Sequence, residues 1–252
     1  MSALIKAVAG VLVLSGFAGG GYLIYDSTLR VVYPLSSLEG FATKYQNTTF
    51  GGKYGRYMLD PARNKNAWNE AYKRWSSSTA TKSAEFTGND KVTAAYHEST
   101  ATALNKVCEA AFNKQSTDVK SGTNTNYEND VWTYCSIVKE KPKTISENTS
   151  ETYTDAKIGS SKKTTLVSTE YSGNSIFWDI RNEEFYSSSG SRSGKDLDTA
   201  KSKSKFKIKY DAGNKSEHIK DICKAAYLTD SSNNTEYPSD DVVKFCTLDG
   251  SN

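Results

Sequence analysis

The sequence has 252 residues, with 32 lysines and arginines against 29 aspartates and glutamates, which gives a net charge of +3. A balance so close to neutral argues against a protein that binds nucleic acid through clustered lysine and arginine. Beyond its apolar N-terminus, the chain is long enough for two small hydrophobic cores.

The N-terminus carries the longest apolar segment. Residues 7–25 form an uncharged run of 19 residues, about the length of helix that crosses a bilayer. We therefore expect residues 1–29 to be a transmembrane anchor that contacts membrane lipid through residues 4–25. The alternative is a cleaved signal peptide, because Gly16-Phe17-Ala18 resembles a small-residue cleavage site.

The rest of the chain contains two similar stretches. Residues 104–112 (LNKVCEAAF) resemble residues 219–227 (IKDICKAAY), and residues 130–137 (DVWTYCSI) resemble residues 241–248 (DVVKFCTL). The offsets are 115 and 111 residues at the cysteines, and Trp68 precedes Trp178 by 110. A nearly constant offset indicates a tandem repeat. We predict repeat modules over residues 30–137 and 138–252.

Each module is expected to contain three helices. In the first copy, Asp60 and Pro61 are suited to begin a helix, and its residues at helical spacing are Trp68, Ala71, Tyr72 and Trp75. The counterpart in the second copy is less regular, with Phe177, Trp178, Ile180 and Phe185.

The second helix of each copy has the clearest pattern. Its apolar residues follow the i, i+3, i+4, i+7, i+8 spacing of one helix face, as Leu104, Val107, Cys108, Ala111 and Phe112, and again as Ile219, Ile222, Cys223, Ala226 and Tyr227. The third helix carries Val131, Tyr134, Cys135 and Val138 in the first copy, and Val242, Phe245 and Cys246 in the second.

Strand signals are fewer. Residues 205–210 alternate between polar and apolar side chains, and residues 165–169 are rich in β-branched residues. Neither segment has a clear counterpart in the first copy. We predict a mainly α fold of two tandem small helical modules after the N-terminal transmembrane helix, with α+β modules as the alternative.

The four cysteines lie at equivalent points of the two copies. Because duplication copies a self-contained bridge, we expect one internal disulfide in each module, between Cys108 and Cys135 and between Cys223 and Cys246. The alternative is four buried free thiols. Closing loops of 27 and 23 residues stabilises each small core by about 3 kcal/mol in the chain-entropy model.

The sequence offers no catalytic, cofactor or metal site. The two histidines, His97 and His218, do not occupy equivalent positions, which argues against a zinc site or a cysteine–histidine nucleophile. The adjacent acidic residues Glu183-Glu184 and Asp240-Asp241 are interpreted as solvated or helix-start charges. The glycines around Arg192 are interpreted as a flexible loop, because a nucleophile elbow needs serine at that position.

Several motifs together resemble a known group of proteins. They are Asn66-Ala-Trp68 with Tyr72, Cys108 with Ala110-Ala111, and the segment Trp132-Thr-Tyr-Cys135-Ser136, all behind a short apolar N-terminus. This combination resembles the large multi-copy families of surface or exported proteins of haemotropic mycoplasmas. The resemblance implies surface exposure, with a role in antigenic variation or host-cell contact, and it supplies no catalytic residues. The second copy departs from the pattern, since Val243 stands where the first copy has Trp132.

These observations favour a membrane-anchored extracellular protein that is not an enzyme and acts as a surface antigen or host-contact protein. Its expected partners are membrane lipid and a host-cell protein, with no nucleic acid. The paired cysteines suit the oxidising setting outside the cell membrane, and the same setting would hold for a chain secreted after signal cleavage. Two other functions stay open: an exported hydrolase with carboxylates distant in sequence, and a structural envelope protein that associates with itself.

Overall fold

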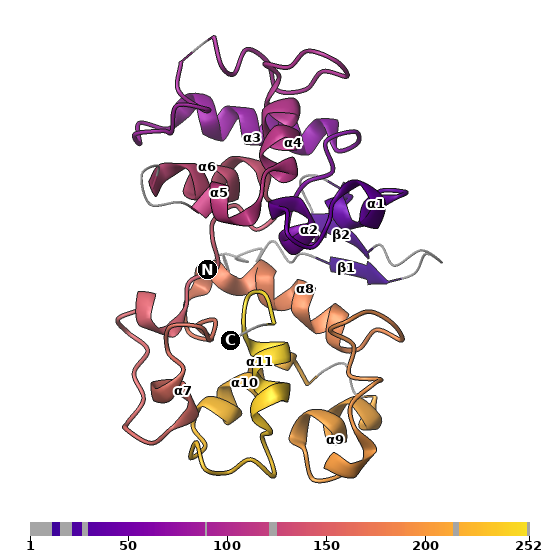
Figure 1. Ribbon diagram of the computed structural model, residues 1–252, viewed down its shortest axis with the longest axis vertical. Coiled ribbons are helices and arrows are strands. Elements are labelled where there is room, and N and C mark those ends of the chain that lie inside the picture. Colours follow the sequence, from indigo (N-terminus) through magenta and orange to yellow (C-terminus); the bar gives the residue numbers. More distant parts are fainter. Residues whose placement is uncertain are drawn as a thin grey trace, which may run out of the picture.

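The computed structural model describes residues 12–15, 22–26, 30–88, 90–120, 125–213 and 217–250. Over these residues the protein is mainly α-helical, with eleven α-helices and two disulfides. The helices form two groups that follow one another along the long axis of the molecule (Figure 1). We call residues 30–137 the first half and residues 138–250 the second half.

The first half contains three longer helices and three short ones. Residues 35–37 form a turn of 3-10 helix before them. The helices are α1 (Phe41–Lys44), α2 (Phe50–Tyr54), α3 (Lys65–Ser77), α4 (Leu104–Asn113), α5 (Ser116–Lys120) and α6 (Thr125–Cys135).

The second half repeats much of this order. It also begins with a 3-10 turn, at residues 145–147. Its helices are α7 (Ile158–Ser161), α8 (Ser175–Phe185), α9 (Lys205–Ala212), α10 (Ile219–Tyr227) and α11 (Ser239–Cys246).

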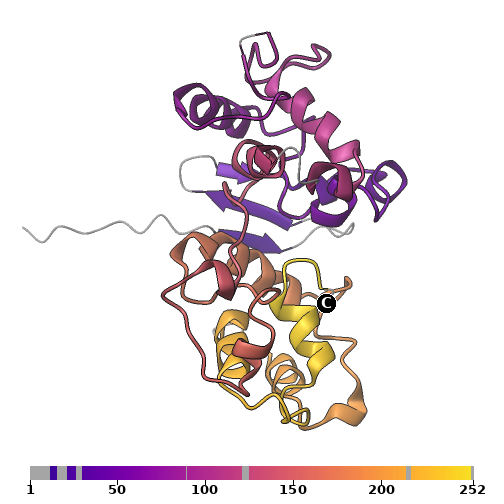
Figure 2. The same ribbon diagram turned by 60° about the vertical axis from the view of Figure 1, so that its left-hand side comes forward.

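Three short strands precede the helices. They are β1 (Leu12–Ser15), β2 (Tyr22–Asp26) and β3 (Arg30–Val32), which pair antiparallel in that order. β1 lies beside α8 at the boundary between the halves (Figures 1 and 2). The predicted anchor over residues 4–25 falls largely outside the described residues, and its described parts are β1 and β2. Among the helices that the structure describes, none combines the length and apolar character needed to cross a bilayer.

The two halves share side-chain contacts at equivalent positions. In the first half, the amide group of Asn64 accepts from the backbone N–H of Tyr33 (2.7 Å) and donates to its carbonyl (2.6 Å). In the second half, Asn174 makes the same pair of bonds to Lys143, each at 2.9 Å. The chain entering each half is therefore fastened to the start of its long helix by an asparagine.

The tryptophans of the long helices occupy matching sites as well. The indole N–H of Trp68 donates to the carbonyl of Asp60, and that of Trp178 donates to the carbonyl of Ser168, both at 3.0 Å. Both rings are almost fully buried. A buried indole N–H usually has an acceptor, and these carbonyls fix where each of the two rings lies.

The aromatic core is larger in the first half. Trp132 is fully buried and has three aromatic neighbours, with ring centroids 5.2 to 6.2 Å away: Phe50, Tyr54 and Tyr57. Val243, which stands in its place in the second half, is also buried. Both positions are therefore buried, and the two halves differ in that a tryptophan packs among aromatic rings in the first half and a valine stands there in the second.

Several local predictions were wrong. The helix expected to begin at Asp60 begins at Lys65, because Asp60 instead accepts from the backbone N–H of Ala62 and from the guanidinium of Arg63, and Asn64 has a positive φ of 62°. Residues 205–210 are helix α9 rather than a strand. Phe206 and Tyr210 are also spaced i, i+4, and Gly213, at φ 63°, ends that helix.

Two other predictions concern extended or terminal residues. Residues 165–169 contribute only isolated bridges, from Leu166 to Thr247 and from Val167 to Thr144. The last helix of each half ends at its second cysteine, Cys135 or Cys246, and Val138 lies beyond the end of α6.

Candidate functional site

Each half is closed by the disulfide that was predicted for it. Cys108 on α4 is bonded to Cys135 at the end of α6, with 5.6 Å between their Cα atoms, and Cys223 on α10 is bonded to Cys246 at the end of α11, with 5.7 Å. All four side chains are completely buried, and none of the four is a free thiol. These bridges join the fourth and the last helix of each half and indicate an oxidising, extracytoplasmic location.

The histidines have local partners. His97 accepts through Nδ1 from the backbone N–H groups of Ser99 and Thr100. His218 precedes α10, accepts from the N–H of Lys220 and lies 3.4 Å from the carboxylate of Asp179. Within the described part of the chain, no group of three or more histidine, cysteine or acidic side chains is arranged to hold a metal ion.

Among the acidic residues interpreted as solvated or helix-start charges, Asp240 and Asp241 do lie in the first turn of α11, but one member of each pair is buried. Glu184 is 5 % exposed and forms ion pairs with Arg56 (2.8 Å) and Arg181 (3.1 Å). Asp241 is 4 % exposed and accepts from the hydroxyl of Ser204 at 2.8 Å. The sequence does not indicate which member of each pair, Glu183-Glu184 or Asp240-Asp241, is the buried one.

Arg192, at the centre of the glycine-containing segment, is held by the C-terminal part of the chain. Its guanidinium donates to the carbonyls of Lys244 (2.6 Å) and Leu248 (3.1 Å). Burial lowers its pKa to about 10. The segment around Arg192 is a loop, as predicted, and these two bonds attach its guanidinium to the C-terminal segment.

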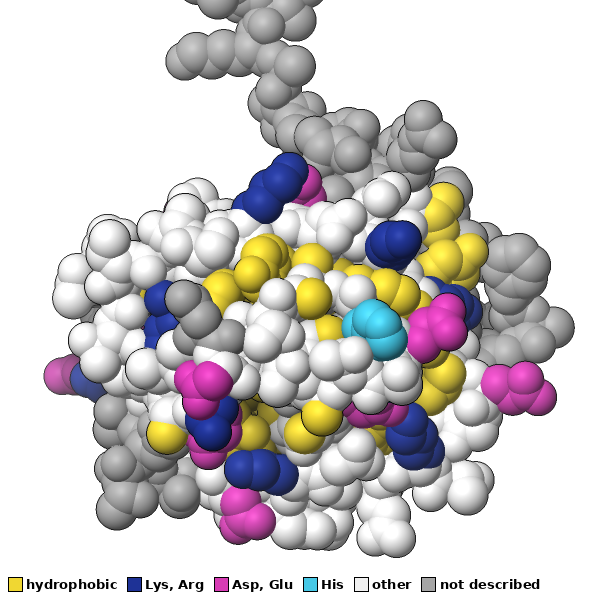
Figure 3. All heavy atoms as spheres, turned by 90° about the horizontal axis from the view of Figure 1, so that it is seen from above, with side chains coloured by type: hydrophobic (Ala, Val, Ile, Leu, Met, Phe, Trp, Pro, Cys, Tyr) yellow, Lys and Arg dark blue, Asp and Glu magenta, His cyan; other side chains and the backbone are white. Residues whose placement is uncertain are grey.

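The surface of the first half has a hollow of about 480 Å³ at the end of α3. Its lining comes from the last turns of α3 and from the loop that follows them: Tyr72, Trp75, Ser76, Ala80, Thr81, Lys82, Thr87 and Gly88. Figure 3 shows the outer end of this half from above, where apolar side chains form a band with charged side chains scattered around it. We call this space the α3 hollow.

A second, smaller hollow of about 210 Å³ lies in the second half. It is lined mainly by hydroxyl and amide side chains, and also by Glu151, Tyr153 and Lys163. Glu151 is 5 % exposed and accepts from the hydroxyls of Tyr153 (2.7 Å), Thr169 (3.0 Å) and Ser168. These three hydroxyls hold the carboxylate in place beside the hollow.

The sequence did not indicate either hollow. Tyr72 and Trp75 were predicted on the buried face of a helix, and Trp75 is indeed 7 % exposed. Tyr72, however, is only half-buried, because the face that it shares with Trp75 runs to the edge of the core. Lys82 belongs to a polar loop, and nothing in the sequence marked it as part of a hollow.

Comparisons with other proteins gave no match. No protein-family model fits the chain, and neither a curated protein nor a solved structure is significantly similar to it.

Proposed function

We propose that this protein is a membrane-anchored extracellular contact protein, a surface antigen or host-contact molecule, built from two copies of one disulfide-closed helical module. The observation that carries the proposal is the pair of buried disulfides at equivalent places in the two halves. A bridge of this kind is typical of small exported domains whose cores need covalent support.

The recurrence of contacts supports the duplication. The carbonyl of Cys135 accepts from the N–H of Leu59 in the first half, and the carbonyl of Cys246 accepts from the N–H of Val167 in the second. The hydroxyls that follow them, on Ser136 and Thr247, each accept from a residue three positions later, Lys139 and Gly250. Both of these later residues have a positive φ, 67° and 74°. Unrelated segments would not share a disulfide, a strand-like bond and a left-handed turn in the same order.

The membrane anchor is proposed from the sequence alone, since the described parts of the N-terminal segment are the strands β1 and β2. The uncharged run of residues 7–25 is long enough for a membrane helix, and a chain held by it would place both disulfide-closed halves on the oxidising side. The likeness of its motifs to the multi-copy surface proteins of haemotropic mycoplasmas gives the same orientation.

The chemistry of the described residues favours contact over catalysis. Cys108, Cys135, Cys223 and Cys246 are bonded in pairs and cannot act as nucleophiles or metal ligands. The buried carboxylates of Glu151, Glu184 and Asp241 are bonded to hydroxyls or guanidinium groups. The outer end of the first half instead presents apolar side chains (Figure 3), and the α3 hollow lies at the end of α3.

The proposal is tested with the full chain exported by a bacterium and displayed on its cells. A biotin reagent that does not cross membranes should label lysines of both halves on intact cells, and those cells should adhere to animal cells more than cells with an empty vector. Retention of the chain inside the cell, or labelling without any gain in adhesion, would contradict the proposal.

A further inference from the structure

The α3 hollow has the size of a small-ligand site. Its volume of about 480 Å³ lies within the range of roughly 300–1,000 Å³ that such sites occupy. It is open to solvent, and its lining combines aromatic rings with hydroxyls and one ammonium group. Each of these groups restricts the kind of ligand that can bind.

One wall of the hollow is a fixed aromatic surface. The rings of Tyr72 and Trp75 are stacked, with centroids 5.3 Å apart and an angle of 27° between the planes. The indole N–H of Trp75 donates to the carbonyl of Phe86 at 2.8 Å, which holds that ring in place. Tyr72 is half-buried against it. Aromatic faces are electron-rich and pack well against flat groups with polarised C–H bonds, such as one side of a sugar ring.

The hydroxyls of the hollow are set to accept. The Ser76 hydroxyl donates to the carbonyl of Lys73 (3.1 Å), and the Thr87 hydroxyl donates toward the carbonyls of Lys82 (2.9 Å) and Ser83 (2.7 Å). Because each hydroxyl has a single hydrogen, its remaining lone pairs can only accept. A ligand that binds these oxygens must supply donors of its own, as the hydroxyls of a sugar do.

The charge of the lining selects among such ligands. Lys82 is its charged group: Nζ donates to the carbonyl of Ser78 at 2.8 Å and lies 5.8 Å from the Trp75 ring. An ammonium has three donors, so two remain for a ligand. The eight described residues that line the hollow include no carboxylate. The carboxylate of Asp130 interacts with Lys82 from outside the lining, so an anionic group would meet a positive charge that Asp130 partly offsets.

We propose that the α3 hollow binds an acidic sugar unit of a glycan. The sugar ring packs on the open side of Tyr72, which the buried ring of Trp75 supports from behind. Its hydroxyls donate to the oxygens of Ser76 and Thr87, and its carboxylate accepts from the ammonium of Lys82. This proposal rests on the proposed function and gives the contact protein a ligand class.

The stacked aromatic pair is not repeated at the corresponding positions of the second half. With the offset of 110 residues that relates Trp68 to Trp178, the positions of Tyr72 and Trp75 correspond to Asn182 and Phe185. The ring of Phe185 is buried and lies 5.9 Å from that of Tyr210. Because an asparagine replaces the tyrosine, we expect the sugar to bind in the first half and not at these described residues of the second.

The test uses the full chain in detergent micelles and two matched sugars. Methyl glucuronide carries a carboxylate where methyl glucoside carries a hydroxymethyl group, and a galacturonide and N-acetylneuraminic acid extend the acidic set. Saturation-transfer NMR and titration should show binding of at least one acidic sugar, at least about fivefold tighter than its neutral counterpart, which is the scale of one charge-assisted hydrogen bond.

Two variants locate the site, and two others serve as controls. Lys82→Gln should reduce the preference for the acidic sugar to less than twofold, and Tyr72→Ala should abolish binding of both sugars. Lys73→Gln is the matched control, since that lysine is exposed beside the hollow, is paired with Glu70 and is absent from the lining; it should leave binding unchanged. Tyr72→Phe keeps the aromatic ring and removes only the hydroxyl, so it should bind and unfold like the unaltered chain. Thermal unfolding of Tyr72→Ala then separates the loss of the ring from a loss of folding.

The outcomes distinguish this inference from the proposed function. If no acidic sugar binds, or if Lys82→Gln and Lys73→Gln behave alike, the sugar site is contradicted. If cells displaying Tyr72→Ala adhere as strongly as cells displaying the unaltered chain, the contact function stands and the sugar site does not. If the unaltered chain is not displayed on the cells, the proposed function is contradicted. The acidic-sugar site is then still tested by sugar binding to the chain in micelles.

Discussion

The guanidinium of Arg181, in the second half, donates at 2.6 Å to the hydroxyl of Tyr57, in the first half. Both side chains are buried. Arg181 also donates to the carbonyls of Phe245 (2.8 Å) and Thr247 (3.0 Å), at the end of α11 and just beyond it. A single charged side chain therefore connects α8, the C-terminal segment and the first half.

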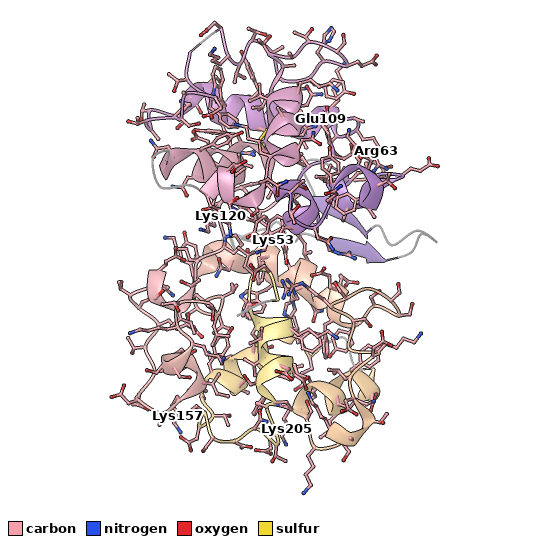
Figure 4. All side chains as sticks on the ribbon, viewed as in Figure 1. Lys53, Arg63, Glu109, Lys120, Lys157 and Lys205 are labelled. Atoms are coloured by element: carbon pink, nitrogen blue, oxygen red, sulfur yellow. A yellow bond between two sulfur atoms is a disulfide. The ribbon has the colours of Figure 1, made fainter. Side chains whose placement is uncertain are left out.

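Other contacts cross the same boundary. Arg56 pairs with Glu184 at 2.8 Å, Lys53 pairs with Asp249 at 2.7 Å, and the rings of Tyr57 and Phe177 lie 5.4 Å apart. Figure 4 labels Lys53 where the two halves meet. Burial lowers the pKa of Arg181, but Tyr57 and Glu184 outweigh it, so that the net pKa is above the usual value. The arginine stays charged and the halves are held together by a paired, hydrogen-bonded cation.

Replacing this cation should destabilise the protein strongly. Arg181→Met leaves two buried carbonyls and the Tyr57 hydroxyl without their donor, and we expect a loss of about 3–5 kcal/mol in the free energy of unfolding. Tyr57→Phe should cost about 1–3 kcal/mol. Because the two groups are bonded, urea unfolding of the double variant should show less than the sum of the two losses. Strict additivity would mean that the bond across the boundary does not exist in solution.

An exposed pair provides the control for these variants. Lys157 and Asp230 form an ion pair at 2.9 Å whose side chains are 32 % and 59 % exposed. Solvent screens such pairs, so Lys157→Met should change the free energy of unfolding by less than about 1 kcal/mol.

Removing either disulfide should have nearly the same effect. The loops that the two bridges close contain 27 and 23 residues, and the chain-entropy model gives about 3.5 kcal/mol for each. Replacing Cys108 and Cys135 together by serine, or Cys223 and Cys246 together, should lower the unfolding free energy by similar amounts in guanidinium titrations. A loss below about 1 kcal/mol for one pair would show that this bridge is not closed in the native protein.

The two asparagines at the starts of the halves give a test of their equivalence. Asn64→Asp and Asn174→Asp each keep the acceptor but remove the amide donors that bind two carbonyls. We expect losses of about 2 kcal/mol at the half-buried Asn64 and about 3 kcal/mol at the fully buried Asn174, since a charge facing carbonyl oxygens is costly when buried. Thermal unfolding measures both, and no loss at one site would argue against equivalent roles.

Buried tyrosines should limit stability at high pH. Burial raises the pKa of Tyr54 to about 12, and it also raises the pKa values of Tyr57 and Tyr227. In the unfolded chain a tyrosine loses its proton near pH 10. The stabilisation is therefore complete below about pH 10 and is lost as the pH rises through about 12, by about 1.4 kcal/mol per pH unit for each tyrosine.

The ultraviolet absorbance of tyrosinate checks this behaviour. These tyrosines should ionise together with unfolding, in one cooperative step, and Tyr54→Phe should make the loss of stability with pH less steep. Gradual ionisation with the fold intact would contradict their burial.

Sequence patterns predicted the helices whose apolar face meets the core. Residues 104–112 and 219–227 have regular spacing on both sides of a cysteine, and both are helices. The pairing of the cysteines followed from the same similarity. For residues 205–210 the pattern indicated a strand, whereas the segment is a helix. Its apolar residues fit both the two-residue period of a strand and the i, i+4 spacing of a helix, so the pattern alone could not decide between them. Ser204, bonded to Asp241, starts that helix.

The boundary between the halves could not be predicted. Arg181 occupies the position that corresponds to Ala71, and a charged residue on a helix is usually exposed. Its burial depends on Tyr57 and on carbonyls more than 60 residues later in the chain. The α3 hollow was missed for a related reason, since Lys82 reaches it from a loop whose course is decided by contacts such as that between Trp75 and Phe86.

The central claim is that both halves lie outside the membrane, each closed by its own disulfide. Protease treatment of intact cells that carry the full chain, followed by thiol blocking and mass-spectrometric mapping of unreduced peptides, tests it directly. We predict that peptides from residues 30–250 are released from outside, that Cys108 is linked to Cys135 and Cys223 to Cys246, and that reductant separates each pair. Blocked free thiols, a link between the halves, or protection of these residues until the cells are lysed would contradict the claim.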